Sequence, residues 1–221
     1  MQIGIIADIH GNLPALEAVL KDMPPVEKVV CLGDIVGYNP WPAAAVEQVR
    51  SHADHSLKGN HDRYVYRPES TGMNTAAAAA LRYTAEHLSD EKKNWLLSLN
   101  DKATVLGTGL YAVHSHPERL DRYVMPGQFE EMTSYLDGYD GLLLAHTHIQ
   151  HSEDVDGNPV VNPGSVGQPR DGDPRAAYAV MDTEGSDVEL RRVSYDVAAV
   201  QAAIREAGLP GELADRLADG R

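Results

Sequence analysis

Five short segments carry side chains that can bind divalent metal ions, and each ends or directly follows an apolar run. They are Asp8-Ile9-His10, Gly33-Asp34, Gly59-Asn60-His61-Asp62, His114, and His146-Thr147-His148. Carboxylate and amide oxygens together with imidazole nitrogens form the mixed donor set that suits first-row divalent cations. Each segment alone has an ordinary alternative, a polar turn or a solvated histidine. Together they predict one dinuclear metal site at the ends of several strands.

Spacing within these segments indicates which side chains would bind a metal ion and which would act on the substrate. Asp8 and His10 are two residues apart, and in extended chain such side chains point the same way and can face one ion. The carboxylate of Asp34 can bridge two cations with its two oxygens and offset their repulsion. His61 directly follows Asn60 and would point elsewhere, so it stays free for proton transfer or charge stabilisation.

The remaining histidines follow strand-like runs in the second half of the chain. His146 and His148 come after the apolar run 142–145 and are spaced to serve one ion each. His114 ends another run, and a lone histidine is more often structural than ligating. Its value as a candidate therefore rests on the other segments. Residues 116–127, which follow it, either form part of a substrate rim or are a plain connection.

Jointly, these motifs resemble those of the calcineurin-like metallophosphoesterase family, whose pattern is DxH, GDxxG or GDxxD, GNHD/E, a lone H and GHxH. The chain carries all five in family order between Met1 and about Tyr195. Residues 33–38 and 162–170 also resemble the small bacterial and archaeal phosphodiesterase branch. The resemblance implies an α/β (α+β) protein with a four-layer fold, a β-sandwich of two mixed sheets flanked by helices.

The resemblance also implies a role for each motif residue. The implied ligands are Asp8, His10 and His148 for a first metal, Asn60, His114 and His146 for a second, and Asp34 for both. His61 would protonate the leaving oxygen or stabilise the phosphoryl oxygens, while a hydroxide held between the metals attacks phosphorus. The implied cofactors are two divalent transition-metal ions, with Mn as first choice and Fe, Ni, Co or Zn as alternatives.

Three positions depart from the family pattern. Gly37 stands where the family's protein Ser/Thr phosphatases have an aspartate that orients the histidine corresponding to His61. The arginine that follows that aspartate is also absent, which argues against a protein-phosphatase role. Ala145 replaces the usual glycine before the last motif, and Ser115 follows His114 where the small branch commonly has glycine.

Two further residues are candidates for supporting roles. With Gly37 in place of aspartate, either Asp62 or a backbone carbonyl is left to orient His61, and we place Asp62 beside His61 as a catalytic candidate. Arg170 lies in a Gly/Pro-rich loop that can approach the site and contact a substrate phosphate. The alternative for Arg170 is a loop-stabilising salt bridge to Asp171 or Asp173.

Composition limits the partners. The chain has 221 residues, 43% of them hydrophobic, and a formal net charge of −14. Such a surface repels nucleic acid and anionic membranes, whether the acidity reflects a salt-adapted cytoplasm or ordinary solubility. Its apolar runs are too short to span a bilayer. The absence of a signal-peptide pattern and the single cysteine, Cys31, in an apolar run favour a cytoplasmic protein with a buried thiol.

Periodicity predicts alternating strands and helices in the first half of the chain and a strand-rich second half. The expected strands are residues 2–7, 27–32, 55–58, 103–106, 110–113, 141–145, 149–154, 159–162, 177–182 and 188–195. The expected helices are residues 12–23, 42–50, 74–88, 89–99, 128–136 and 196–207. Without repeats or linkers, one domain is expected over residues 1–221, with a loose acidic tail at about 210–221.

These features favour a cytoplasmic, dinuclear-metal phosphodiesterase acting on small nucleotide-like or other phosphodiesters. One alternative is a phosphomonoesterase with the same metal site. Another is a non-catalytic interaction scaffold on the same fold, as in the retromer subunit that resembles this family. We expect a small-molecule phosphoester as the partner, with no long nucleic acid and no membrane. Formation of a homo-oligomer is left open.

Overall fold

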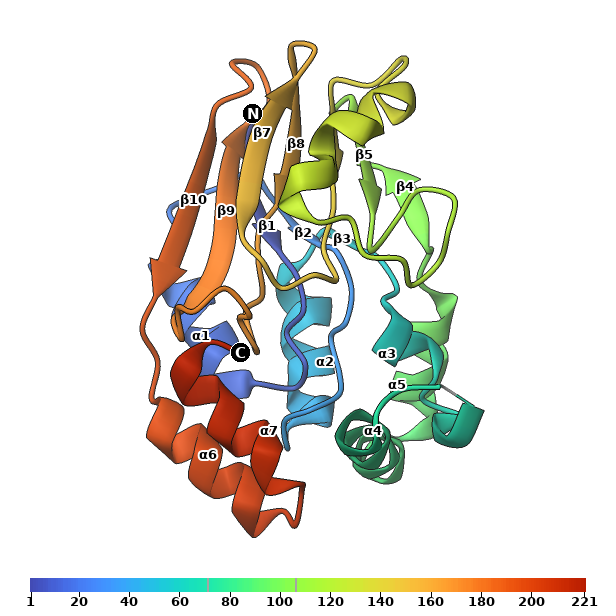
Figure 1. The fold of residues 1–221 in the computed structure, drawn as a ribbon, viewed down its shortest axis with the longest axis vertical. Helices are drawn as coiled ribbons and strands as arrows, with labels where there is room; N and C mark the ends of the chain where they lie inside the picture. The colour runs from blue at the N-terminus through green and yellow to red at the C-terminus, as the bar shows by residue number, and fades with distance from the viewer. Residues whose placement is uncertain (71, 106) are drawn as a thin grey trace.

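Two mixed β-sheets form the centre of the computed structural model, which describes residues 1–70, 72–105 and 107–221. Within this described part, the first sheet has the order β10-β9-β1-β2-β3 and the second β4-β5-β6-β8-β7 (Figure 1). The first sheet comprises β1 (Gln2–Ile6), β2 (Lys28–Cys31), β3 (His55–Ser56), β9 (Ala176–Asp182) and β10 (Val188–Val193). The second comprises β4 (Lys102–Thr104), β5 (Leu110–Val113), β6 (Gly141–Leu143), β7 (His151–Val155) and β8 (Asn158–Asn162).

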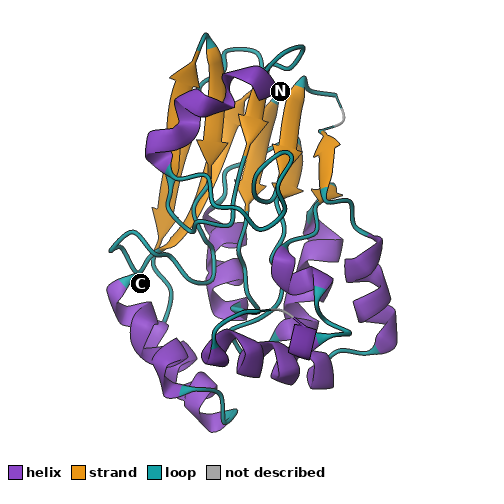
Figure 2. Cartoon of the chain, turned by 45° about the vertical axis from the view of Figure 1, so that its right-hand side comes forward, coloured by secondary structure: helices purple, strands orange, loops and turns teal. Residues whose placement is uncertain are grey.

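The helices gather mainly at one end of the strands, below them in Figure 2. The α-helices are α1 (Leu13–Asp22), α2 (Pro42–His52), α3 (Asn60–Arg63), α4 (Thr75–His87), α5 (Asp90–Ser98), α6 (Val197–Glu206) and α7 (Gly211–Asp215). The 3₁₀ helices are η1 (Pro68–Ser70), η2 (Pro126–Tyr135) and η3 (Arg216–Asp219). Within the described ranges, no helix combines the length and hydrophobicity that a membrane span requires.

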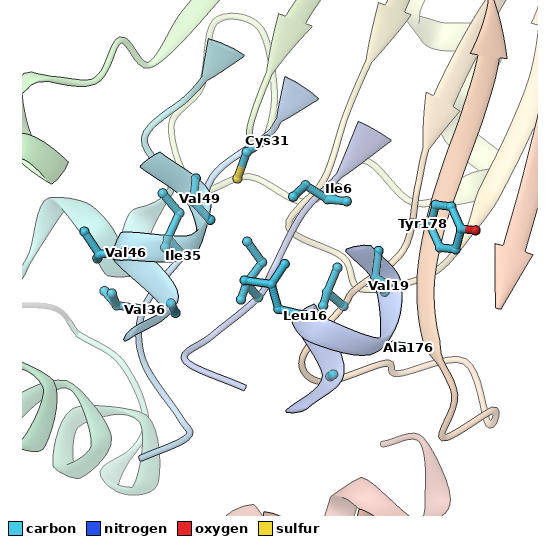
Figure 3. Close-up of a cluster of buried hydrophobic side chains, with 14 of the residues drawn as sticks. Ile6, Leu16, Val19, Cys31, Ile35, Val36, Val46, Val49, Ala176 and Tyr178 are labelled. Carbon is cyan, nitrogen blue, oxygen red and sulfur yellow. The ribbon is translucent and has the colours of Figure 1, made fainter. Parts of the chain in front are cut away.

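Side-chain alternation along β1 shows how the layers are built, because neighbouring residues of a strand face opposite sides of its sheet. Ile5 belongs to a buried cluster with Leu143 and Val161 of the second sheet, so this cluster fills the space between the sheets. Ile6 faces the other way, toward α1 and α2, in the cluster that contains Leu16 (Figure 3). This side of the first sheet is therefore covered by helices.

The outer face of the second sheet is covered by η2. Phe129 and Met132 of η2 pack in one buried cluster with Leu142 and Val160. The molecule thus has helices, a sheet, a second sheet and a further helical segment in succession, which confirms the four-layer sandwich that the resemblance implied. Sequence periodicity predicted an α-helix over 128–136, but the segment winds as a 3₁₀ helix that begins at Pro126.

Parallel pairing sets the position of the site. In the first sheet β1 and β2 are parallel, as are β2 and β3. In the second sheet β5, β6 and β8 are parallel in the same way. The carboxyl ends of parallel strands meet at one edge of a sheet, so the loops that leave these strands come together there.

The elements predicted from the sequence differ from the structure at three further places. Residues from Pro210 onward were expected to be loose, but they form α7 and η3, and Leu213 and Leu217 are buried. The short helix α3, which carries Asn60, was not predicted because four residues give too little periodicity to detect. The predicted strand 103–106 corresponds to β4, and its last residue, Leu106, lies outside the described residues.

Candidate metal centre

The predicted ligands follow strands of both sheets and meet in one buried place. They come after β1 (Asp8 and His10), β2 (Asp34), β3 (Asn60, on α3), β5 (His114) and β6 (His146 and His148). All of these side chains are buried. The order of the motifs along the chain therefore predicted their assembly correctly.

Five of these ligands have a left-handed backbone. Their φ angles are 52° for Asp8, 50° for His10, 53° for Asp34, 70° for His146 and 61° for His148. This conformation is uncommon outside glycine and costs on the order of 1–3 kcal/mol per residue, which is why it concentrates at functional sites. Asp8 and His10 were expected to face one side of an extended chain, and this expectation is wrong. Their side chains converge because the loop turns through left-handed residues.

The first ligand group consists of Asp8, His10 and His148, whose donor atoms lie within 4.8 Å of one another. Nε2 of His10 lies 3.1 Å from Nε2 of His148. Oδ1 of Asp8 lies 3.9 Å from the His10 nitrogen and 3.6 Å from the His148 nitrogen. These three atoms therefore face a common point.

The second group consists of Asp34, His114 and His146, again within 4.8 Å of one another. Oδ1 of Asn60 lies 3.3 Å from Nε2 of His114, so Asn60 can join this second group. These two groups contain the residues that the resemblance assigned to each ion. A third group, His10, Asp34 and His61, also has donor atoms within 4.8 Å of one another and includes the histidine that was expected not to be a ligand.

Asp34 lies between the two groups through a single oxygen. Its Oδ2 is 3.6 Å from Nε2 of His10 and 3.5 Å from Nε2 of His114. Its Oδ1 instead accepts a hydrogen bond of 2.8 Å from the backbone N–H of His61. Bridging through both oxygens was expected. Among the described contacts, Oδ2 is the oxygen that lies near nitrogens of both groups.

Backbone carbonyls fix the orientation of the three innermost histidines. Nδ1 of His10 contacts the carbonyl oxygen of Val36 at 3.0 Å, and Nδ1 of His114 contacts that of Leu32 at 2.9 Å. Nδ1 of His148 contacts the carbonyl oxygen of Gln168 at 2.6 Å. A carbonyl can only accept, so each Nδ1 carries a proton. When the ring is neutral, Nε2 then presents its lone pair to the centre, as metal-ligating histidines usually do.

This protonation pattern fits a metal ion. With both Nδ1 atoms protonated, the Nε2 atoms of His10 and His148 are two lone pairs facing each other at 3.1 Å. Oδ1 of Asp8 beside them is buried and has no hydrogen-bond donor among the described residues. Facing acceptors repel unless a cation lies between them. The oxygen and imidazole donors are those that divalent transition metals take.

The charges of Asp8, Asp34 and His114 shift one another's pKa values. Burial, reinforced by the charge on Asp34, raises the pKa of Asp8 to about 7. Although burial opposes ionisation of Asp34, the charges of His114 and His61 hold its pKa well below the usual value. Although burial also opposes protonation of His114, Asp34 raises the pKa of that imidazole to about 9. Positive charge is therefore favoured next to Asp34.

His61 lies in the centre without being fixed through its ring. The ring centroid is 4.7 Å from that of His10 and 4.6 Å from that of Tyr38. Its Nδ1 is buried and has no hydrogen-bond partner in the described ranges. Burial lowers the pKa of His61, with the neighbouring charges acting in both directions. An imidazole in this position can hold or release a proton at the edge of the metal site.

Asp62 does not contact the His61 ring among the described hydrogen bonds. One of its carboxylate oxygens accepts from the backbone N–H groups of Ile35 and Val36, at 3.0 and 3.2 Å. The other accepts from the N–H of Gly59 at 3.0 Å. Asp62 therefore joins the loops that follow β2 and β3. The expectation that it orients the His61 imidazole finds no support in these contacts.

Arg170 faces the site rather than a carboxylate. Its guanidinium donates to Oε1 of Gln168 at 2.8 Å and to the hydroxyl of Tyr38 at 3.3 Å. The alternative from sequence, a salt bridge to Asp171 or Asp173, is not found in the described structure. Asp171 pairs with Arg192, and Asp173 pairs with Arg175 at 2.6 Å.

A cavity of about 170 Å³ opens above the metal ligands. It is lined by Asp34, Tyr38, Asn60, His61, Met73, Asn74, Ala77, Tyr123, His146, His148 and Arg170. Tyr123 stacks on the ring of His146, with centroids 4.4 Å apart and planes inclined by 17°. Of the segment 116–127, Tyr123 therefore forms part of the rim that the sequence left open.

One residue that positions a candidate ligand, Asp121, was not predicted from the sequence. The backbone carbonyl of Asp121 accepts from Nε2 of His146 at 3.1 Å, which leaves Nδ1 of that ring for the centre. The carboxylate of Asp121 in turn accepts from Arg63 of α3 at 2.8 Å. No local pattern marks Asp121, because its contribution is a main-chain oxygen in a left-handed conformation.

Comparisons with known proteins agree with the fold and the motifs. A model described as calcineurin-like phosphoesterase superfamily domain matches residues 1–186. Uncharacterized protein MJ0912 of Methanocaldococcus jannaschii is 34% identical over 241 residues, covering 99% of this chain and 98% of that protein. Phosphodiesterase YfcE of Escherichia coli is 27% identical over 199 residues, covering 83% of this chain and 89% of YfcE.

Among solved structures, the crystal structure of a metallophosphoesterase from Sphaerobacter thermophilus superposes with a TM-score of 0.86. The two chains are 36% identical, and the match covers 100% of this chain and 99% of the other. The family model spans every predicted ligand, and the structural match includes the helices that follow it. The chain is a member of the calcineurin-like phosphoesterase superfamily, whose hydrolases depend on divalent metal ions.

Proposed function

We propose that this protein is a phosphodiesterase that binds two divalent metal ions and hydrolyses phosphodiesters of small, nucleotide-like molecules. The observation that carries the proposal is the pair of facing Nε2 lone pairs of His10 and His148, with Oδ1 of Asp8 beside them. Buried acceptors arranged in this way need a cation. The similarity to YfcE, named a phosphodiesterase, supports the choice of a diester.

The ligands divide between two ions. Asp8, His10 and His148 would hold the first, while Asn60, His114 and His146 would hold the second. Asp34 would contact both through Oδ2, which lies within 3.6 Å of a nitrogen in each group. Mn is the proposed metal, with Fe, Ni, Co and Zn as alternatives for the same donors. When bound, the ions would supply positive charge for the phosphoryl oxygens and lower the pKa of a water that attacks phosphorus.

The chain's own residues would complete the reaction. His61, beside the cavity and with its backbone N–H on Asp34, would donate a proton to the leaving oxygen or stabilise the phosphoryl oxygens. Arg170 is free of carboxylate partners among the described residues and lines the same cavity, so it can contact a substrate phosphate. Asp62 would hold the loops that present Asp34 and Asn60.

The acidic composition does not oppose this function. A small phosphodiester meets mainly the local field of the site, where the metal charges would outweigh Asp8 and Asp34. A long nucleic acid would meet the surface field of a chain with net charge −14. We therefore propose a small-molecule substrate and no nucleic-acid or membrane partner. The single cysteine fits a cytoplasmic location, and one domain would carry the activity.

A comparison of two chromogenic substrates tests this function. Chelated protein is restored with Mn²⁺, Ni²⁺ or Zn²⁺ in turn and assayed with bis(p-nitrophenyl) phosphate and with p-nitrophenyl phosphate. Metal-dependent cleavage of the diester in excess of the monoester is the expected result. Preferential cleavage of the monoester would replace the proposal by a phosphomonoesterase. Two bound metals without cleavage of either substrate would favour a non-catalytic scaffold.

A further inference from the structure

A second positively charged side chain lies close to Arg170 and comes from the C-terminal segment, beyond the residues that the family model matches. This segment, α6 through η3, packs on α4 and on Tyr38. Ala77 of α4, Tyr38 and Leu217 of η3 share one buried cluster. The same Tyr38 hydroxyl accepts from Arg170, so the docked segment reaches the rim of the metal site.

The second positively charged side chain is Arg216, the first residue of η3, and packing of the segment holds it in place. Its Nε donates to the main-chain oxygen of Arg221 at 2.6 Å, which fixes one side of the guanidinium. Arg216 and Arg221 line a second cavity, of about 380 Å³, together with Asn74. Asn74 also lines the cavity above the metal ligands. The two cavities therefore adjoin at Asn74, with Arg170 in one and Arg216 in the other.

The two guanidinium groups influence each other. Burial lowers the pKa of Arg216, and the charge on Arg170 is the next cause of this lowering, whereas Tyr38, Glu212 and Tyr123 oppose it. Like charges brought together in partial burial are unfavourable unless a counter-charge is present. Such a pair without a carboxylate between its members is suited to an anionic ligand.

The carboxylates nearby do not neutralise the pair. Among the described residues, neither Arg170 nor Arg216 forms an ion pair with Asp or Glu. Asp215, which lines the second cavity, is engaged by Arg205 at 2.7 Å. Glu212 lines the same cavity and offsets part of the charge of Arg216 without pairing with it. Arg170 therefore lies without a carboxylate partner among the described residues, beside the partly offset charge of Arg216.

Building on the proposed phosphodiesterase function, we propose that Arg170 and Arg216 form a subsite for a second anionic group of the substrate, at the Asn74 junction of the two cavities. The enzyme would then select phosphodiesters that carry a further phosphoryl group in addition to the one cleaved. Guanidinium groups bind phosphoryl oxygens through two parallel N–H donors, which gives this recognition both strength and direction.

Equilibrium binding of non-hydrolysable ligands tests the subsite separately from turnover. Isothermal titration compares a straight-chain alkane bisphosphonate, with its groups too far apart to chelate one ion, with the matching alkyl monophosphonate on Mn²⁺-loaded protein. Wild type should bind the bisphosphonate about tenfold or more tightly than the monophosphonate, the range of charge-assisted hydrogen bonds. Arg216→Gln should lose most of this preference, and Arg216→Lys should retain part of it.

Arg82→Gln is the matched control, because it removes a partly exposed arginine of α4 that pairs with Glu69 and lines neither cavity. It should keep the full preference for the bisphosphonate. Equal binding of the two ligands by wild type, or an unaltered preference in Arg216→Gln, would overturn the subsite. Circular dichroism and thermal melting of Arg216→Gln establish that the segment is still docked.

Turnover assays distinguish a failure of the subsite proposal from a failure of the phosphodiesterase proposal. Two p-nitrophenyl phosphodiesters are compared whose second alcohol ends either in a phosphonate or in a hydroxyl. If wild type cleaves neither but prefers the bisphosphonate, the subsite stands and the phosphodiesterase function is wrong. If wild type cleaves both with equal kcat/KM and shows no binding preference, the function stands and the subsite is wrong. Preference in both measurements, reduced together in Arg216→Gln, supports both.

Discussion

A Cβ atom on Gly37 would lie 2.4 Å from Nδ1 of His61, so the glycine and the imidazole occupy adjoining space that admits no side chain. Gly37 also has a φ angle of 101°, which side chains rarely allow. The protein phosphatases of the family are expected to have an aspartate here. In this chain an aspartate would clash with the histidine it is meant to orient.

Gly37→Ala should therefore displace the His61 ring and lower kcat by about 100-fold, as a misplacement of about 1 Å does at other active sites. The metal content should stay near that of wild type, because Gly37 contributes no ligand. Steady-state kinetics with bis(p-nitrophenyl) phosphate and elemental analysis give the two quantities. Gly172→Ala is the control, since Gly172 has a φ angle of 85° but open space around it. If Gly172→Ala lost activity to the same extent, backbone strain rather than displacement of His61 would explain the loss in Gly37→Ala.

His61→Ala should lower kcat by about 10²- to 10⁴-fold, the contribution of a positioned acid or base. Metal content should remain unchanged if His61 acts on the substrate. The alternative is that His61 itself binds a metal ion. It has a geometric basis, because His61 lies within 4.8 Å of donor atoms of His10 and Asp34. Elemental analysis after gel filtration separates the two roles. Loss of one metal together with activity would make His61 a ligand. His87→Ala, on the exposed end of α4, is the matched control.

Asp34→Asn should remove metal and activity together. The amide keeps the shape of the carboxylate but removes the charge that lies between the two ligand groups, where Oδ2 is 3.6 and 3.5 Å from nitrogens of His10 and His114. We expect at least one ion to be lost and kcat/KM to fall by more than about 100-fold. Metal titration and kinetics measure both effects. A variant that retained two tightly bound ions would disprove the bridging role.

Much of the site could be predicted because its residues are tied to local patterns. Asp34 and His114 each follow a short apolar strand, and parallel strands bring their carboxyl ends to one sheet edge. The spacing of the motifs therefore predicted which candidate ligands would come together. It did not reveal the left-handed backbone at Asp8 and His10, because φ there is set by packing of the loop against distant residues.

Other parts of the site depend on contacts between segments far apart in the sequence. Asp121 acts on His146 through a backbone carbonyl, which any residue type could supply. Asp62 was expected to bind a side chain, but backbone N–H groups 26 and 27 residues earlier take one of its oxygens. Arg216 lies in a segment expected to be loose, because its acidic composition hid the spacing of Leu213 and Leu217.

Docking of the C-terminal segment can be tested through Leu217, which is 1% exposed and packs in the cluster with Tyr38. Leu217→Ala should lower the free energy of unfolding by about 2–4 kcal/mol, the cost of a buried Leu-to-Ala change. Urea denaturation of the metal-free proteins measures this change. Leu190→Ala, at a side chain that is 37% exposed, is the control and should cost less than about 1 kcal/mol. Equal effects of the two substitutions would contradict docking of the segment.

Asp173 provides a test of how pH acts on the loop that carries Arg170. Hydrogen bonds from Arg175 lower the pKa of Asp173 to about 2, against 3.8 for the unperturbed group. The folded state thus binds a proton less readily than the unfolded state at this position. The stabilisation is complete above the unfolded value and is lost as pH falls from about 4 through about 2.

Asp173→Asn should therefore lower the melting temperature at pH 7 and have a smaller effect at pH 3. Because the carboxylate is 30% exposed, solvent screening limits the loss at neutral pH to about 0.5–1 kcal/mol, or roughly 1–4 °C. Thermal melts of wild type and variant at pH 7, 5 and 3 measure the difference. Asp137→Asn, at a position without an ion pair in the described structure, controls for the change in net charge. A difference for Asp173→Asn that grew toward low pH would have the wrong sign and would refute the assignment of this carboxylate.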